Sequence, residues 1–174
     1  MSLQPATVEF LQYLRQNPQI RDQIKARSGK TVLYAGKLIL PAWREVDRFR
    51  ETFPEYADKQ TLPEVLALIA LPGCQYDNLY QYLAHICENV PERPDQFVLW
   101  RAVSGIFAKN AVGSVSFCIG SEVTRAEKVF AATEIYVLMR NPNIDELTRD
   151  VLSYYKRCLE NEDHAMNFSF FSAT

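Results

Sequence analysis

The chain has 174 residues, of which 48% are hydrophobic and 23% charged, and its net charge is −2. This composition is typical of a folded protein and excludes a disordered chain, and the length predicts a single domain over residues 1–174. The longest apolar run, residues 65–74, has ten residues, whereas a membrane-spanning helix needs about 20. We therefore expect no membrane segment and no membrane partner.

The first ninety residues are divided by proline and glycine into segments with apolar residues at helical spacing. Thr61 and Glu64 also have the spacing of a capping box, in which two side chains satisfy free N–H groups at a helix start. Residues 30–40 contain β-favouring side chains and predict a strand, although a buried helix fits them as well. Helices are predicted over residues 5–16, 19–27, 41–53, 61–71 and 75–90.

The second half of the chain is less uniform. Residues 96–110 begin with β-favouring side chains, yet their large apolar residues recur as on a buried helix: Phe97, Trp100, Val103 and Phe107. Residues 111–119 carry no charge and predict a strand. Residues 121–140 predict a helix, with a strand over 133–139 as the alternative.

The C-terminal part contains the clearest helical periodicity of the sequence. It runs from residue 142 to residue 159, and Pro142 suits the first turn of such a helix. A short strand is expected at 167–171. The fold class is therefore mainly α, a compact domain of six to seven helices with short strands at 30–40, 111–119 and 167–171, and an α+β fold is the alternative.

Two Asn-Pro pairs, at residues 17–18 and 141–142, each separate an apolar segment from a polar one that favours a helix. They lie 124 residues apart, and no repeat period connects them. We interpret them as two helix starts with the same local chemistry.

The cysteines do not form a metal-binding or disulfide pattern, because no two of them are two or three residues apart. Free thiols buried in the core are expected instead. Such thiols indicate a reducing compartment, which we take to be the cytoplasm, and the N-terminus has no secretory signal. The four are Cys74, Cys87, Cys118 and Cys158.

Charge is unevenly distributed. Residues 15–50 have a net charge of +6, which leaves −8 on the rest of the chain. The two regions either attract an acidic partner or pair with one another on folding, and we favour the second interpretation. Acidic residues also alternate with the arginines of residues 43–51, so a nucleic-acid partner, which needs a patch of one sign, is not expected.

Two further patterns are excluded as sites. The segment Ser28–Thr31 reads Ser-Gly-Lys-Thr, but position 24, where a phosphate-binding loop has glycine, is isoleucine. The histidines, His85 and His164, are not spaced with cysteines or carboxylates as metal ligands, so no metal is predicted.

One set of residues resembles the bacterial mono-ADP-ribosyltransferases, which use an arginine on a strand, a Ser-x-Ser strand and a Glu-x-Glu near the end. The resemblance covers residues 97–171 at most and implies an enzyme that uses nicotinamide adenine dinucleotide (NAD). The arginine and the serines would hold NAD, and the last glutamate would orient the ribose and the acceptor. The spacing departs from the family, since the arginine stands only 13 residues before the first serine. The matching residues are Arg101, Ser114, Ser116, Glu160 and Glu162.

The principal expectation is a non-catalytic domain that binds another protein, of a bacterial effector, immunity or regulatory type. Aromatic residues form 12% of the chain, and tyrosine is enriched at protein interfaces. Tyr76, Tyr80 and Tyr82 are the candidate contact residues. The NAD-using enzyme is the alternative, and it requires Arg101 and Ser114 on two strands that face one cleft.

Overall fold

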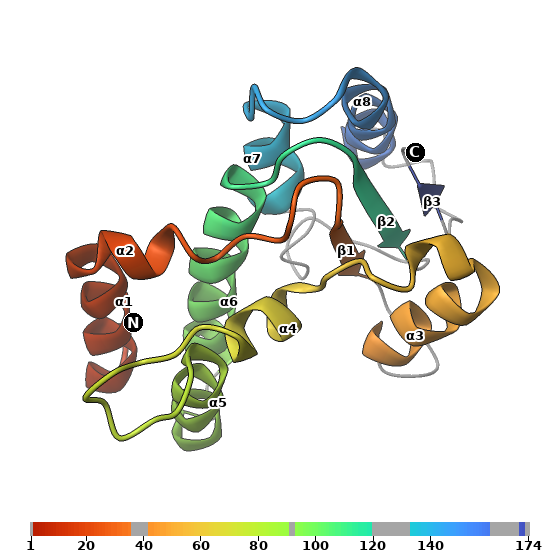
Figure 1. Cartoon of the computed structure of the whole chain (residues 1–174). Helices are drawn as coiled ribbons and strands as arrows, with labels where there is room; N and C mark the ends of the chain where they lie inside the picture. The colour runs from red at the N-terminus through yellow and green to blue at the C-terminus, as the bar shows by residue number, and fades with distance from the viewer. Residues whose placement is uncertain (1, 36–41, 91–92, 120–132, 161–170, 173–174) are drawn as a thin grey trace.

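The computed structural model describes residues 2–35, 42–90, 93–119, 133–160 and 171–172 (Figure 1). Within these ranges the chain is mainly helical, and strands occur in or overlap all three expected segments, so the predicted fold class is confirmed. The strands are β1 (Thr31–Ala35), β2 (Val115–Ile119) and β3 (Phe171–Ser172). The helices are α1 (Pro5–Gln16), α2 (Pro18–Arg21), α3 (Ala42–Thr52), α4 (Leu62–Ala67), α5 (Leu79–Asn89), α6 (Arg93–Lys109), α7 (Ile135–Met139) and α8 (Glu146–Glu160), with a short 3₁₀ turn at Pro54–Tyr56.

The sheet is built around a parallel pair. Strands β1 and β2 run in register from Thr31 opposite Val115 to Ala35 opposite Ile119, and β3 adds two residues antiparallel to β2. Parallel neighbours need a long crossover connection, which is supplied here by the segment that contains α3 to α6. The carboxyl ends of β1 and β2 therefore lie at the same edge of the sheet.

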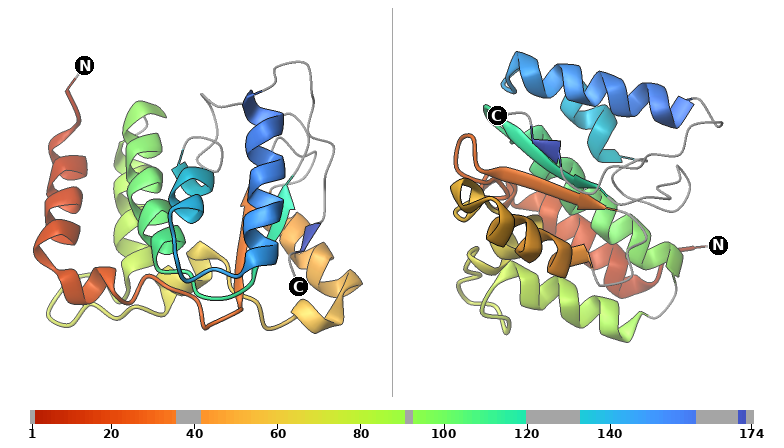
Figure 2. Two further views of the ribbon diagram at one scale, coloured as in Figure 1. Left: turned by 90° about the horizontal axis from the view of Figure 1, so that it is seen from above. Right: turned by 90° about the vertical axis from the view of Figure 1, so that its right-hand side faces the viewer.

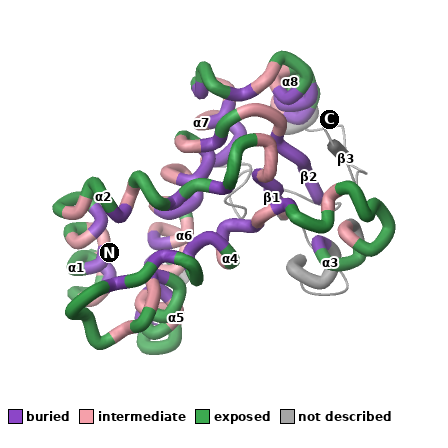
Figure 3. The backbone as a smooth tube through the Cα atoms, in the orientation of Figure 1, coloured by how far each residue is buried: buried purple, intermediate pink, exposed green. Residues whose placement is uncertain are grey.

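Helix α6 lies at the centre of the molecule. Helices α1 and α5 lie on one side of it, and the strands followed by α3 lie on the other (Figures 1 and 2). Leu99, Val103 and Phe107 are completely buried on α6, and the tube of Figure 3 is purple along this face. The four-residue spacing of these side chains explains why residues 96–109 form a helix, so the strand expected for Arg101 from the transferase resemblance is wrong.

The parallel strand pair is covered on both faces. Leu33, Val115 and Phe117 belong to the large core that the helices build. Val32 and Cys118 instead form a small second cluster with Val46 of α3. This alternation is the two-residue period expected of a strand buried on both sides.

Several helix ends differ from the predicted ones. Helix α2 ends at Arg21, and α4 ends at Ala67. Residues 135–139 form a helix rather than the alternative strand, while the part of the expected 121–140 helix before residue 133 lies outside the described residues. Across the described ranges, no helix is both long and apolar enough to cross a bilayer.

Candidate functional site

The residues of the transferase resemblance do not come together as that family arranges them. Arg101 lies on helix α6, not on a strand, and its Nε donates a hydrogen bond to Oγ1 of Thr133 at 2.7 Å. Ser116 is buried within β2, and the buried hydroxyl of Ser114 has no hydrogen-bond partner among the residues that the structure describes. Glu160 is the last residue of α8, and its side chain is not described; Glu162 lies outside the described residues.

The contact of Arg101 leads to a glutamate that the sequence analysis missed. Glu134 directly follows Thr133 and is only 6% exposed. The side chain of Ser104, one turn beyond Arg101 on α6, forms a hydrogen bond with its carboxyl group. Burial raises the pKa of Glu134 to about 8, and the Ser104 hydrogen bond opposes this rise only in part.

The sequence did contain a signal for this residue. Glu134 is the one charged residue in the eleven-residue run 129–139. A single ionisable group within an apolar segment is either turned outward or buried at a cost, and here it is buried.

Tyr34, at the carboxyl end of β1, responds to the charge of Glu134. Burial is the main reason why the pKa of Tyr34 is raised to about 12, and the negative charges of Glu134, Tyr80 and Glu64 add to the rise. The pKa of Tyr34 therefore responds to two carboxyl groups, that of Glu134 at the start of α7 and that of Glu64 on α4.

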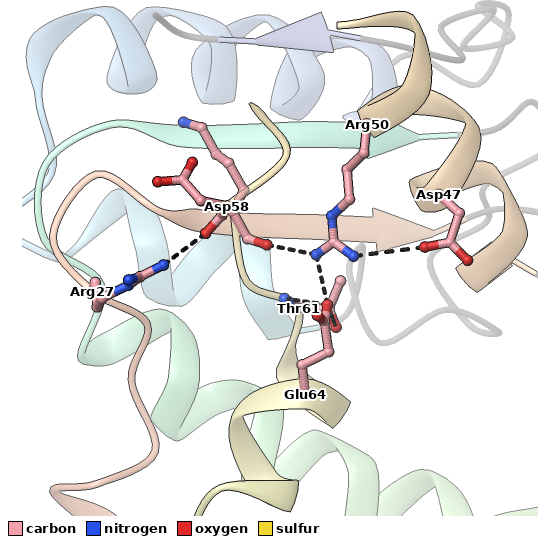
Figure 4. A network of polar contacts seen from close by, with 7 residues as sticks. Arg27, Asp47, Arg50, Asp58, Thr61 and Glu64 are labelled. Carbon is pink, nitrogen blue, oxygen red and sulfur yellow. Dashed lines mark hydrogen bonds and ion pairs between the residues drawn. The ribbon is translucent and has the colours of Figure 1, made fainter. Parts of the chain in front are cut away.

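Glu64, the second carboxyl group, is held in its ionised form (Figure 4). Its Oε1 accepts hydrogen bonds from Nη2 of Arg50 at 2.6 Å and from the Thr61 hydroxyl at 2.6 Å. The backbone N–H of Thr61 also donates to it at 3.2 Å, so the predicted capping box is confirmed. Burial tends to raise the pKa of Glu64, but these hydrogen bonds outweigh burial and keep the pKa below its ordinary value.

Tyr34, Glu64, Ser104 and Glu134 are named here the Glu134 site. Its two carboxyl groups have pKa values shifted in opposite directions, one raised by burial and the other lowered by hydrogen bonds. The site also includes the carboxyl end of a parallel strand, where ligands of sheets with helical crossovers bind.

The three candidate contact tyrosines do not share one environment, because Tyr76 and Tyr82 contact each other and Tyr80 is exposed. Tyr82 packs on Phe10 and stacks on Tyr13, with ring centroids 5.1 and 5.6 Å apart, and Tyr76 meets Tyr82 edge-on at 4.8 Å. Tyr13, Tyr76 and Tyr82 are all partly buried against the core. Tyr80, also on α5, is 40% exposed. Its negative charge when ionised helps to raise the pKa of Tyr34.

The basic region is paired within the chain. Nζ of Lys30 lies 2.8 Å from Asp58, and Arg50 binds Glu64, so cations of residues 15–50 meet carboxylates beyond it. The Ser-Gly-Lys-Thr segment thus uses its lysine in an ion pair.

The histidine and cysteine residues do not build a metal centre in the part of the chain that the structure describes, where no group of three possible ligands converges. His85 is exposed and lies beside the Tyr76 ring, 5.3 Å between centroids. Cys74, Cys87 and Cys118 are free thiols as expected, but only Cys118 is buried. Cys87 is half-buried, and Cys74 is exposed because it follows the Pro72-Gly73 turn. His164 and the side chain of Cys158 are not described.

The chain was compared with protein-family models, with curated proteins and with solved structures, and none of them matches it. The functional proposals therefore rest on the Glu134 site and on the cluster of Tyr13, Tyr76 and Tyr82.

Proposed function

We propose that the chain is an enzyme that breaks a glycosidic bond of a nucleotide, with NAD as its substrate and Glu134 as the reacting carboxyl group. The observation that carries the proposal is the Glu134 site. A buried carboxyl group with a pKa of about 8 and an ionised carboxylate, Glu64, both neighbour Tyr34. Ionisable groups shifted this far by burial are concentrated at functional sites.

The chemistry of such a pair suits attack at the anomeric carbon of a sugar. In NAD the bond between ribose C1′ and the pyridinium nitrogen breaks, and nicotinamide leaves as a neutral molecule with the bonding electrons. The ribosyl cation that forms is stabilised by a carboxylate. Water then bonds to C1′ and gives its proton to Glu134, which at a raised pKa is a stronger base than an ordinary carboxylate.

NAD is proposed as the substrate because the sequence resembles the ADP-ribosyltransferases, although Arg101 lies on helix α6 and not on a strand. This arginine is exposed on α6 and lies one turn before Ser104.

The test is release of nicotinamide from NAD by the purified chain, compared with Glu134→Gln. The substitution should lower kcat about 100-fold or more, since it removes the base. In the unaltered protein kcat/KM should rise with pH, reach half of its maximum near pH 8, where half of Glu134 is ionised, and level off above that pH. Glu55→Gln, at an exposed glutamate, is the control. An unaltered chain that releases no nicotinamide, or a fully active Glu134→Gln, contradicts the proposal.

A second candidate function, binding of another protein, is favoured by the cluster of Tyr13, Tyr76 and Tyr82. The Tyr13 ring stacks on Tyr82, the Tyr76 ring meets Tyr82 edge-on, and all three rings keep part of their surface exposed. Aromatic side chains held rigidly at a surface supply apolar contact area at little cost in entropy. This function does not exclude the first, because Tyr76 and Tyr82 are not part of the Glu134 site.

Its test is affinity capture with the unaltered chain and with Tyr76→Ala. A protein bound through the cluster should be retained by the first and lost by the second, with a fall in affinity of about tenfold or more. Tyr154→Ala replaces a tyrosine of α8 that is 43% exposed and serves as the control. If Tyr76→Ala and Tyr154→Ala both lose the captured protein, or if neither does, the cluster of Tyr13, Tyr76 and Tyr82 is not the binding surface.

The compartment proposed for either function is the cytoplasm. Support comes from Cys74, Cys87 and Cys118, which are free thiols, because thiols persist where the surroundings are reducing.

A further inference from the structure

Two neighbouring residues at the start of α7 are held by two residues one turn apart on α6. Nε of Arg101 donates to Oγ1 of Thr133 at 2.7 Å, and the side chain of Ser104 binds the carboxyl group of Glu134. The two contacts join segments about thirty residues apart in sequence. They fix both the backbone position and the side-chain direction at this point.

Thr133 is held at both ends of its short side chain. Its hydroxyl binds Arg101, and its methyl group packs against the backbone of α6 at Gly105, where an added Cβ would lie 3.4 Å from Cγ2 of Thr133. Thr133 and Glu134 also have π-helical rather than α-helical geometry. A π-helical turn is uncommon and occurs frequently at functional sites.

The guanidinium group of Arg101 contacts Thr133 and Phe97, and its charge is not among the causes of the pKa shift of Glu134. Its guanidinium lies over the Phe97 ring, 5.5 Å from the centroid, while Nε faces Thr133. The effects that set the pKa of Glu134 are burial and the Ser104 hydrogen bond. An arginine acting directly on the carboxylate would lower that pKa, so the geometry favours an action through Thr133.

We propose that Arg101 is a positioning residue, which acts through Thr133 to hold the start of α7 so that Glu134 faces Ser104. The inference rests on the proposed function for its kinetic consequence, but its structural part does not depend on that function. It also gives Arg101 a role different from the NAD contact that the resemblance implied.

The experiment uses Arg101→Met and Thr133→Val, which remove the hydrogen bond from either side, and the double variant. Arg101→Lys keeps a donor and is the conservative control. The first readout needs no substrate: the pKa of Glu134 is followed by NMR of protein labelled with carbon-13 at glutamate, with Glu134→Gln to assign the signal. The second readout is the split between kcat and KM for nicotinamide release.

In both single variants the Glu134 pKa should rise further above its ordinary value, because the carboxyl group loses the Ser104 hydrogen bond that opposes the effect of burial. Loss of kcat should be about 10- to 100-fold with little change in KM. The double variant should be no worse than either single one, as for two residues that act as a unit. Arg101→Lys should recover part of both effects.

Three results would overturn the inference. One is a pKa of Glu134 that is unchanged in folded Arg101→Met and Thr133→Val. Another is a loss of activity in Arg101→Met that Thr133→Val does not share, since this would mean direct contact between Arg101 and the substrate. The third is additive loss in the double variant. If the unaltered chain releases no nicotinamide, the proposed function fails, and the NMR titration still decides the positioning role.

Discussion

Glu134 makes the folded state sensitive to pH. Its pKa is about 8 in the folded chain, compared with an ordinary value of 4.5. Between these two pH values the unfolded chain has released the proton and the folded chain has kept it. The free energy of unfolding should therefore fall as pH rises from about 4.5 to about 8 and then stay level.

Replacement of Glu134 by Gln should remove this dependence. The amide can keep a hydrogen bond to Ser104 but carries no charge, so the variant should be more stable than the unaltered chain at pH 8.5. The gain should reach several kcal/mol, since each pKa unit corresponds to about 1.4 kcal/mol, and it should vanish near pH 4. Urea unfolding at both pH values measures the difference.

The same residue should thus be costly to stability and necessary for activity. Glu55→Gln, measured alongside, should show no gain that depends on pH. If the unfolding free energies of Glu134→Gln and the unaltered protein differ equally at pH 4 and pH 8.5, Glu134 does not have a raised pKa in solution.

At the scale of the elements, the sequence predicts helix positions better than helix ends. Apolar periodicity located α1, α3, α5 and α8, and the capping pair at Thr61 located the start of α4. Apolar periodicity did not decide whether residues 96–110 form a helix or a strand, because α6 is the central helix and apolar side chains lie on several of its faces. A helix covered on more than one side loses the contrast on which periodicity depends.

The Asn-Pro pairs show why helix ends depend on tertiary contacts. Pro18 does begin α2, and Nδ2 of Asn17 donates to the Tyr13 carbonyl oxygen at the end of α1 at 2.7 Å. Pro142 does not begin α8, which starts at Glu146 with Asp145 Oδ1 accepting from the Thr148 N–H at 2.8 Å. Asn141 is instead buried and donates to the carbonyl oxygens of residues 108, 109 and 111.

The candidate site was less predictable than the fold for a similar reason. Glu134 could have been noticed as a lone charge in an apolar run, but its partners could not. Tyr34 stands one hundred residues before it and Ser104 thirty, and only the packing of β1, α6 and α7 brings them together. The transferase pattern found Arg101 and assigned it to the wrong kind of element.

At the scale of the whole molecule, ion pairs join the basic region, residues 15–50, to the acidic rest of the chain. Arg50 of α3 donates to the carbonyl oxygen of Lys59 and to the Glu64 carboxylate of α4, and it also lies 3.6 Å from Asp47 (Figure 4). Lys30 and Arg27 both bind Asp58, the first through its carboxylate and the second through its carbonyl oxygen. These contacts link the ends of the long segment between β1 and α4.

Arg50→Met should therefore destabilise the molecule by more than an ordinary surface substitution does. The side chain of Arg50 is only 17% exposed, and its loss leaves the Lys59 carbonyl and the Glu64 carboxylate without this donor. Hydrogen bonds to charged groups contribute about 1.5–3 kcal/mol each, so a loss of about 2 kcal/mol in unfolding free energy is expected. Lys25→Met makes the same change of charge at an exposed position of the basic region and should change stability by less than about 0.5 kcal/mol.

The pKa of Glu64 offers a second measurement on the same pair of variants. Without Arg50 the hydrogen bonds that oppose burial are weakened, so the Glu64 pKa should rise in Arg50→Met and stay unchanged in Lys25→Met. Stability that depends on an ionised Glu64 is present at neutral pH and is lost as pH falls through its lowered pKa, so the two variants should converge at acid pH. Equal destabilisation by both substitutions at neutral pH would mean that net charge, and not the Arg50 contacts, joins the two regions.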